Sequence, residues 1–316
     1  LIELIGLVTL TISFIFSLYI LGDIFTPITK KEFICSLKVI LRYSCPRFLA
    51  SFVYAVFFSL NAILAAHLAS VRDIGYLTNS QSILVSLSVV VAPFNLILFP
   101  KISSMIGMKR EDEIKKNLNY LIGASIQCSF FVFVQLMVFS DAIIIYWLGY
   151  DFLPAVPVMH IIFASSIFYI FSTAVGGVLE ASKVRPINLE NMSISLAVSL
   201  CVTAGLLYFL KTYPVIISLS IGFSSGLTCL GVLSYISIRE MYPEKIRIDL
   251  NYLFIAGIIN IVLGSIAITL KPYIILRFDY IVIFEIVLFF VYVLILWLLR
   301  TDWLRKIPDI ILSEQT

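Results

Sequence analysis

The chain contains nine long apolar segments that carry almost no charge. They cover residues 1–22, 46–70, 76–105, 117–148, 154–181, 188–210, 214–238, 250–270 and 279–299. Each is long enough for an α-helix to cross a hydrocarbon core of about 30 Å. Hydrophobic residues make up 61% of the chain and charged residues 13%, far from the averages of soluble globular domains. We therefore predict an all-α polytopic membrane protein with about nine transmembrane helices.

The distribution of Lys and Arg predicts the orientation of these helices. Of 22 Lys and Arg, 16 lie within junctions of one parity and 4 within junctions of the other, and the remaining two, Arg47 and Lys101, lie in the ends of segments that border the first set. Because cationic loops resist translocation, the rich side is expected in the cytoplasm, together with the C-terminus. Leu1 is then expected on the non-cytoplasmic side of the cytoplasmic membrane. An odd number of segments, without an initial Met, indicates that further helices precede Leu1.

The basic membrane face suits contact with anionic lipids, and the net charge of +3 does not indicate a nucleic-acid partner. The longest polar junction, residues 23–45, contains a basic amphipathic stretch at 31–43. Its apolar residues share one helical face, and its cations lie elsewhere. We predict a short helix at the cytoplasmic interface that links the first segment to the following eight.

The motif GFSSG at 222–226 has two interpretations. It matches the G-x-S-x-G pattern of hydrolases, which requires a strand–turn–helix context and a His partner. It also reads G-x-x-x-G within an apolar helix, which is typical of close helix packing. We favour packing of Gly222 and Gly226 against a neighbouring helix. No metal or cofactor motif occurs in the sequence, so neither a cofactor nor a chemical step is expected.

Three segments carry polar residues along one helical face. The first face has the spacing 4-3-4-3-4 and the sequence Arg47, Ser51, Tyr54, Phe58, Asn61 and Ala65. The second consists of Ser166, Tyr169, Thr173, Gly176 and Glu180, and the third of Asn188, Asn191, Ser195, Ser199 and Thr203. Such faces either line a water-filled cavity or pack against other helices through small and polar residues. For Glu180, a solvated ion pair with nearby cations is the preferred interpretation.

Four stretches carry a resemblance to a known family. They are LRYSCPRFLASFVYAVFFSLNAILAAHLASVRDIGYL (41–77), FNLILFPKISSM (94–105), WLGYDFLPAVPVMHII (147–162) and GGVLEASKVRPIN (176–188). Their order and spacing resemble those of polysaccharide biosynthesis proteins of the oligosaccharide flippase type, which belong with the multidrug and lipid-linked oligosaccharide exporters. The resemblance implies two six-helix lobes around a central cavity. Residues 1–22 would then end the first lobe, 23–45 would form the linker, 46–240 the second lobe, and 241–316 two additional helices with a tail.

The resemblance implies that the protein moves an oligosaccharide linked to polyprenyl pyrophosphate across the cytoplasmic membrane, for surface polysaccharide biosynthesis. Arg47 would bind the pyrophosphate at the cytoplasmic mouth. The hydroxyl and amide groups that would bind the sugar are Ser51, Tyr54, Asn61, Tyr169, Thr173 and Asn191. Similar proteins often have an acid near the position of Asn61. Expected partners are the lipid-linked oligosaccharide, membrane lipids and other polysaccharide assembly proteins.

Three alternatives stay open at this point. A related exporter of amphipathic cations or drugs would have the same fold. A membrane glycosyl or acyl transferase would need acids, His or Arg gathered on a catalytic loop, and the outer loops contain few acids. A purely structural partner would not need polar helix faces.

Overall fold

The computed structural model describes residues 11–13, 16, 30–89, 104–105, 108, 111–182, 186–209, 214–242, 250–275 and 277–298. The main helices of this part are α2 (Lys30–Leu68), α3 (Val71–Ser86), α5 (Glu111–Trp147), α6 (Val156–Phe163), α7 (Ser166–Ser182), α8 (Ile187–Phe209), α9 (Val215–Met241), α10 (Leu250–Ile274) and α11 (Phe278–Leu298). A 3-10 helix, η2 (Tyr150–Ala155), precedes α6. The chain divides into two compact units, Leu1–Phe48 and Leu49–Thr316.

Six helices in the described residues are long and apolar enough to cross a membrane. Their crossing segments are Glu32–Leu68, Leu121–Trp147, Ile187–Phe209, Val215–Met241, Phe254–Ile274 and Phe278–Leu298. A bent pair, Tyr150–Phe163 with Ser166–Glu180, forms a seventh if it is one broken span. The predicted all-α membrane protein is thereby confirmed. The count of nine stays a prediction, because segment 1–22 lies almost wholly outside the described residues, and segment 76–105 lies within them mainly up to residue 89.

The helices place apolar side chains outward and polar side chains inward. On α8, Ile194 and Leu200 are exposed, whereas the hydroxyls of Ser195, Ser199 and Thr203 are buried. This pattern is the reverse of that in a soluble helix and suits a surface that faces hydrocarbon.

Close approach of α9 to its neighbours depends on glycine. A Cβ atom added to Gly226 would lie 2.7 Å from the ring of Phe57 on α2 and 2.8 Å from Cβ of Ser199 on α8. An added Cβ at Gly222 would overlap Thr203 of α8. The packing interpretation of the G-x-x-x-G motif is therefore confirmed, because any larger residue would separate these helices.

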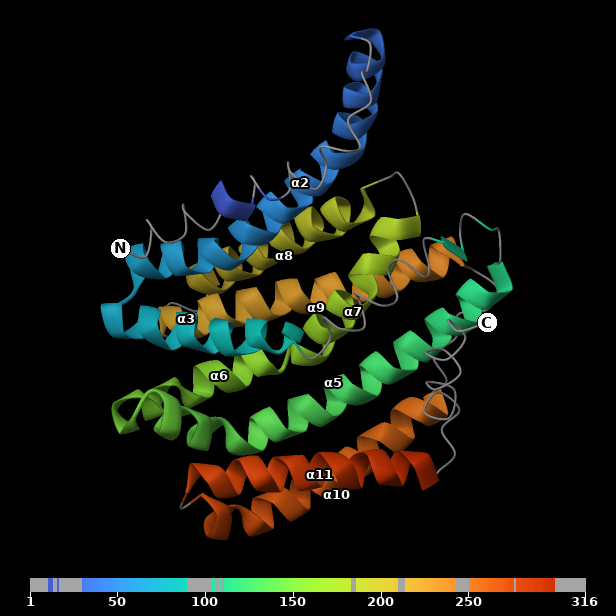
Figure 1. Cartoon of the computed structure of the whole chain (residues 1–316). Helices are drawn as coiled ribbons and strands as arrows, with labels where there is room; N and C mark the ends of the chain where they lie inside the picture. The colour runs from blue at the N-terminus through green and yellow to red at the C-terminus, as the bar shows by residue number, and fades with distance from the viewer. Residues whose placement is uncertain are drawn as a thin grey trace. The chain divides into compact units, whose positions relative to one another are not determined.

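Helix α5 is shared by two hydrophobic cores. Its residues Leu118, Leu136 and Ile144 belong to a core formed with α2, α3, α6, α7 and α9. Its residues Phe131 and Phe139 pack on the other side, against α10 and α11. Figure 1 shows α10 and α11 side by side, next to α5. The two predicted additional helices thus pack on the face of α5 that points away from α7.

Two helix boundaries differ strongly from the sequence prediction, and smaller shifts occur elsewhere, as at α3, which begins at Val71 and not at residue 76. The amphipathic stretch 31–43 and the apolar segment that follows belong to the single helix α2, which continues through Pro46. Flanking backbone hydrogen bonds maintain a helix through proline where no water competes for them. Conversely, the predicted segment 154–181 is broken between α6 and α7, with a bend of 51°. At the break, the hydroxyl of Ser165 donates to the carbonyl of Ile162 at 2.6 Å and competes with regular helix bonding.

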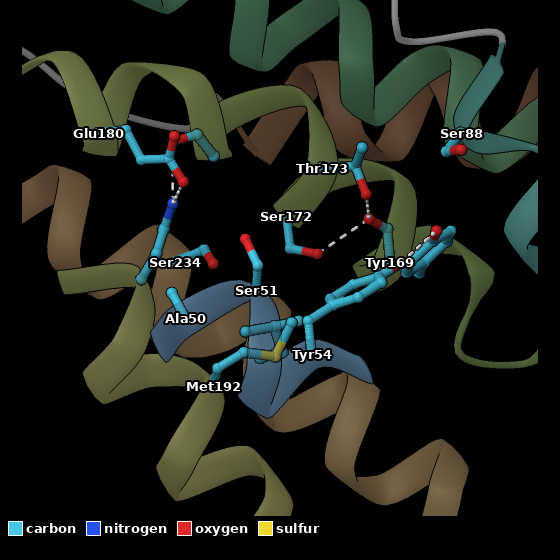
Figure 2. Close-up of a pocket in the computed structure, with 13 residues that line it drawn as sticks. Ala50, Ser51, Tyr54, Ser88, Tyr169, Ser172, Thr173, Glu180, Met192 and Ser234 are labelled. Carbon is cyan, nitrogen blue, oxygen red and sulfur yellow. Dashed lines mark hydrogen bonds between the residues drawn. The ribbon is translucent and has the colours of Figure 1, made fainter. Parts of the chain in front are cut away.

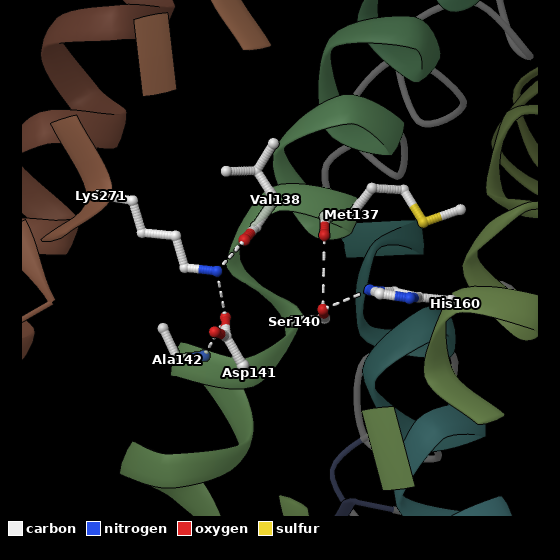
Figure 3. A network of polar contacts seen from close by, with 7 residues as sticks. All are labelled: Met137, Val138, Ser140, Asp141, Ala142, His160 and Lys271. Carbon is white, nitrogen blue, oxygen red and sulfur yellow. Dashed lines mark hydrogen bonds and ion pairs between the residues drawn. The ribbon is translucent and has the colours of Figure 1, made fainter. Parts of the chain in front are cut away.

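Three of the four junctions of the cation-poor parity lie within or mostly within the described residues, and these three meet at one end of the Leu49–Thr316 unit. Arg72 Nη2, at the start of α3, donates to the carbonyl of Asp151 in η2 at 2.7 Å. Lys271 of α10 forms an ion pair of 2.6 Å with Asp141 of α5 and donates to the carbonyl of Val138 at 2.7 Å. Figure 3 shows this ion pair. These contacts agree with the alternation of the helices that the sequence predicts.

Beside this ion pair, His160 Nε2 of α6 lies 2.7 Å from the hydroxyl of Ser140 on α5. The two pairs are carried by adjacent residues of α5, Ser140 and Asp141 (Figure 3). Together they connect α5 to α6 on one side and to α10 on the other.

We predict that Gly226→Ala destabilises the protein by about 1–3 kcal/mol, because the methyl group would force Phe57 and Ser199 apart. The measurement is the unfolding temperature of the detergent-solubilised protein. The matched control is Gly205→Ala on α8, where an added Cβ has no neighbour within 4 Å. The control should be neutral or slightly stabilising. Equal effects of the two substitutions would contradict the packing role of Gly226.

Candidate substrate cavity

A cavity of about 350 Å³ lies among α2, α7, α8 and α9, next to the end of the helical segment that contains α3. Its lining consists of Ala50, Ser51, Tyr54, Ser88, Tyr169, Ser172, Thr173, Gly176, Glu180, Asn188, Met192, Leu230 and Ser234. Figure 2 shows these side chains. All of them belong to the unit Leu49–Thr316. The volume lies within the range of small-molecule pockets, about 300–1,000 Å³.

Helix α7 supplies the longest wall of the cavity. Its five lining residues recur at spacings of three and four, or are adjacent, so they share one helical face. Glu180 follows Tyr169 by eleven positions, a rise of about 16 Å along the helix. The cavity therefore extends over about half the thickness of a hydrocarbon core, from the middle of the bent span α6–α7 to the end of α7.

The inner end of the cavity is formed by two tyrosines. The hydroxyls of Tyr54 on α2 and Tyr169 on α7 are 3.0 Å apart and form a hydrogen bond. In the next turn of α2, the ring of Phe58 packs 4.7 Å from that of Tyr54 and 5.3 Å from that of Phe223 on α9, between centroids. Tyr54 is the last residue of α2 in the lining, so this aromatic cluster ends the cavity.

The opposite end is formed by an amide and a carboxylate. Asn188 Nδ2, at the start of α8, donates to Oε1 of Glu180 at 2.9 Å and to the carbonyl of Gly176 at 3.2 Å. An added Cβ at Gly176 would lie 3.9 Å from Nδ2, an ordinary van der Waals distance, so the amide does not depend on glycine at this position. The two bonds tie α7 to α8 and hold the carboxylate in the cavity wall (Figure 2).

The lining offers hydroxyl groups, an amide and one carboxylate. Seven of the lining residues carry a hydroxyl, and Glu180 is the one acid among them. The hydroxyls of Ser172 and Thr173 donate to the carbonyl of Tyr169, at 2.9 and 2.8 Å. The described lining contains no Lys, Arg or His. Within the described residues, no group of three or more His, Cys, Asp and Glu could hold a metal ion.

Four of the seven predicted site residues line this cavity, and they come from two helices. They are Ser51, Tyr54, Tyr169 and Thr173. The prediction did not include Ser88, Ser172, Asn188 and Ser234. Asn188 could have been found, because it lies on the polar face of its segment. Glu180, for which the sequence favoured a solvated ion pair, contributes its carboxylate to the lining.

The other three predicted residues are not among the lining residues. Asn61 is 4% exposed, and its amide donates to the carbonyl of Phe57 in its own helix at 3.3 Å. Asn191 is buried and donates to the hydroxyl of Ser237 on α9 at 3.0 Å. Arg47 belongs to the unit Leu1–Phe48 and is not among the lining residues. Asn61 and Asn191 are therefore left out of the site that we propose.

Comparison with protein-family models, with curated proteins and with solved structures found no match for this chain. The geometry of the cavity therefore carries the functional argument.

We predict that Tyr54→Phe and Tyr169→Phe each destabilise the protein by about 0.5–1.5 kcal/mol, because each removes the hydrogen bond that joins α2 to α7. The double variant should be little less stable than either single variant, since the bond is already lost. The measurement is a double-mutant cycle on unfolding in detergent. Tyr150→Phe, at an exposed tyrosine, is the neutral control. Additive losses in the double variant would contradict a direct bond.

Proposed function

We propose that the protein is a membrane transporter that moves a polyprenyl-pyrophosphate-linked oligosaccharide across the cytoplasmic membrane. The observation that supports this most directly is the cavity, in which hydroxyls, an amide and a carboxylate from separate helices converge. Sugars present many hydroxyl groups, each of which donates and accepts hydrogen bonds, and this lining offers both kinds of partner. The rings of Tyr54 and Tyr169 add apolar surface for the faces of a sugar.

The extent of the cavity supports access from one side at a time. The cavity reaches the end of α7 and the start of α8, a junction that is cytoplasmic in the orientation we propose. In the other direction it ends at the aromatic cluster of Tyr54, Phe58 and Tyr169. A sugar head would enter from the cytoplasm, while its lipid tail stays in the bilayer. The head would reach the outer leaflet after the helices rearrange, as in transporters with alternating access.

In this proposal the pyrophosphate binds Arg47 of α2. Arg47 precedes Ala50 by three positions in that helix. Its guanidinium would pair with phosphate oxygens through two parallel hydrogen bonds. The sugar and the pyrophosphate would thus use different residues, because the described lining of the cavity contains no cation.

We predict that Ser51→Phe abolishes most of the transport, because its ring would occupy the cavity that receives the sugar. The measurement is the amount of surface polysaccharide in cells that depend on the full-length protein, at an equal protein level in the membrane. Ser59→Phe is the matched control, since Ser59 is exposed on the same helix and does not line the cavity. Undiminished polysaccharide in Ser51→Phe would contradict the proposed site.

We predict that Arg47→Ala reduces surface polysaccharide, and that Arg47→Lys retains part of it, because lysine keeps the charge but not the two-pronged geometry. The comparison is with Arg42→Ala, at an exposed arginine five positions earlier in α2. Equal output from wild type and Arg47→Ala would remove the pyrophosphate assignment. It would leave the cavity assignment standing.

A second candidate function is the export of amphipathic cations. It is favoured by Glu180 together with the rings of Tyr54 and Tyr169, since carboxylates and aromatic faces both attract cations. Efflux of a fluorescent cation from vesicles, compared with transport of a lipid-linked sugar, separates the two candidates. The hydroxyl-rich lining favours the sugar.

A further inference from the structure

We propose that Glu285 is a proton-binding site within the crossing segment of α11, and that its proton holds α11 against α5. The site is separate from the substrate cavity, since Glu285 is not among the lining residues of that cavity. The inference goes beyond the proposed function, because the ligand is a proton and neither the argument nor the test involves the transported sugar.

Glu285 lies on the side of α11 that packs against α5 and α10. Ile281 and Leu288, four positions before it and three after it, are buried in the core that these three helices form. Oε1 of Glu285 is buried and has no hydrogen-bond partner among the described residues. Glu285 lies in the segment Phe278–Leu298, which is long and apolar enough to cross a membrane, so hydrocarbon does not supply a partner either.

No described cation forms an ion pair with Glu285. The described titratable and charged side chains near the contacts of the three helices are Cys128, Asp141 and Tyr146 of α5, Lys271 of α10, and Asp279 and Tyr292 of α11. Of the cations, Lys271 is bound to Asp141 at 2.6 Å. Arg277, just before α11, is bound to Asp279 at 2.7 Å. An ionised Glu285 would therefore be a charge without a described counter-ion.

The side of α5 that faces α11 carries an amide without a partner at a similar level. Two ring contacts join these helices, with centroid distances of 6.1 Å for Phe139 with Phe284 and 5.7 Å for Phe131 with Phe289. Gln135 lies midway between the two rings of α5, and Glu285 lies between the two rings of α11. Gln135 is 7% exposed, and neither its amide oxygen nor its amide nitrogen has a hydrogen-bond partner among the described residues.

A proton on Glu285 suits this interface better than a charge does. Taking an ionised carboxylate out of water without an ion pair is unfavourable, whereas a protonated carboxyl is neutral. It also has an O–H donor besides its acceptor oxygen, so a protonated carboxyl and an amide can form two hydrogen bonds with each other. Protonated Glu285 can thus satisfy Gln135 across the contact of α5 with α11. Loss of the proton removes the donor, introduces a charge and favours a separation of the two helices that admits water.

The first test measures the proton directly, by reaction with dicyclohexylcarbodiimide, an apolar reagent that modifies protonated carboxyl groups. Ile286, the next residue of α11, is 52% exposed, so a reagent dissolved in the bilayer can reach this turn. The full-length protein in proteoliposomes is treated near pH 6 and near pH 9, and the modified fraction of Glu285 is measured by mass spectrometry. We expect the fraction to be about fivefold or more higher near pH 6. Exposed, ion-paired Asp279 is the internal control and should react little at either pH.

The second test measures whether the proton holds the helices together. The folded protein keeps a proton that the unfolded chain releases near the ordinary range of Glu, about pH 4.3, so stability from this site is present at low pH and is lost as the pH rises. Glu285→Gln keeps a neutral side chain of similar shape. From pH 6 to pH 9, we expect the unfolding temperature of wild type in detergent to fall by about 3 °C or more beyond the change in Glu285→Gln.

The matched control is Asp279→Asn, which removes a carboxylate from the same helix at an exposed position. It should keep the pH dependence of wild type. Equal pH dependence in wild type and Glu285→Gln would show that the proton does not hold α11 against α5.

The carbodiimide reaction on wild type decides the proton site even if Glu285→Gln does not fold. No modification of Glu285, or equal modification near pH 6 and pH 9, would contradict a site that binds and releases a proton. Neither test uses a lipid-linked sugar. Failure here therefore leaves the proposed function standing, and failure of sugar transport leaves the proton site standing.

Discussion

Hydrocarbon offers no hydrogen-bonding partner, so a polar side chain of these helices is costly unless it finds one within the protein or in an aqueous cavity. Many hydroxyls donate to a carbonyl one turn earlier, as Ser220 does to Ile216 at 2.7 Å. Others connect two helices, as Asn191 and Ser237 do at 3.0 Å between α8 and α9. Bonds of the second kind determine which helix faces meet. The polar groups of the cavity are the third case, because they border space that a polar ligand or water can fill.

This constraint explains why both interpretations of the polar faces apply, each to a different part of one helix. On α8, Asn188 borders the cavity, whereas Ser199 and Thr203 pack against the glycines of α9. Where Gly222 and Gly226 bring α9 close, small polar residues of α8 are needed for packing. Beyond them, toward the start of α8, the helices leave space and the polar face borders a cavity. The same spacing in the sequence therefore serves packing in one place and a candidate site in another.

The periodicity of the sequence predicted the apolar helices and which residues share a face, because both depend on neighbours within one segment. It placed Ser51, Tyr54, Tyr169 and Thr173 on inward faces, and these residues do line the cavity. It could not show that Tyr54 meets Tyr169, since that contact joins positions 115 apart and depends on how α2 packs on α7. The break between α6 and α7 escaped prediction for a related reason. Hydropathy is continuous across Ser165, so it gives no sign of the bend.

The cation-poor end of the Leu49–Thr316 unit shows how cations remain where the charge pattern disfavours them. Four of the 22 Lys and Arg belong to junctions of that parity. Of these, Lys271 pairs with Asp141 and also binds a backbone carbonyl of α5. Arg72 binds a carbonyl of η2. Lys271 and Arg72 are therefore bound by groups of neighbouring helical segments. Each connects two such segments and is not an unpaired charge in a loop. We propose the orientation of the helices from the other 18 Lys and Arg residues. That orientation does not require this end of the unit to be free of cations.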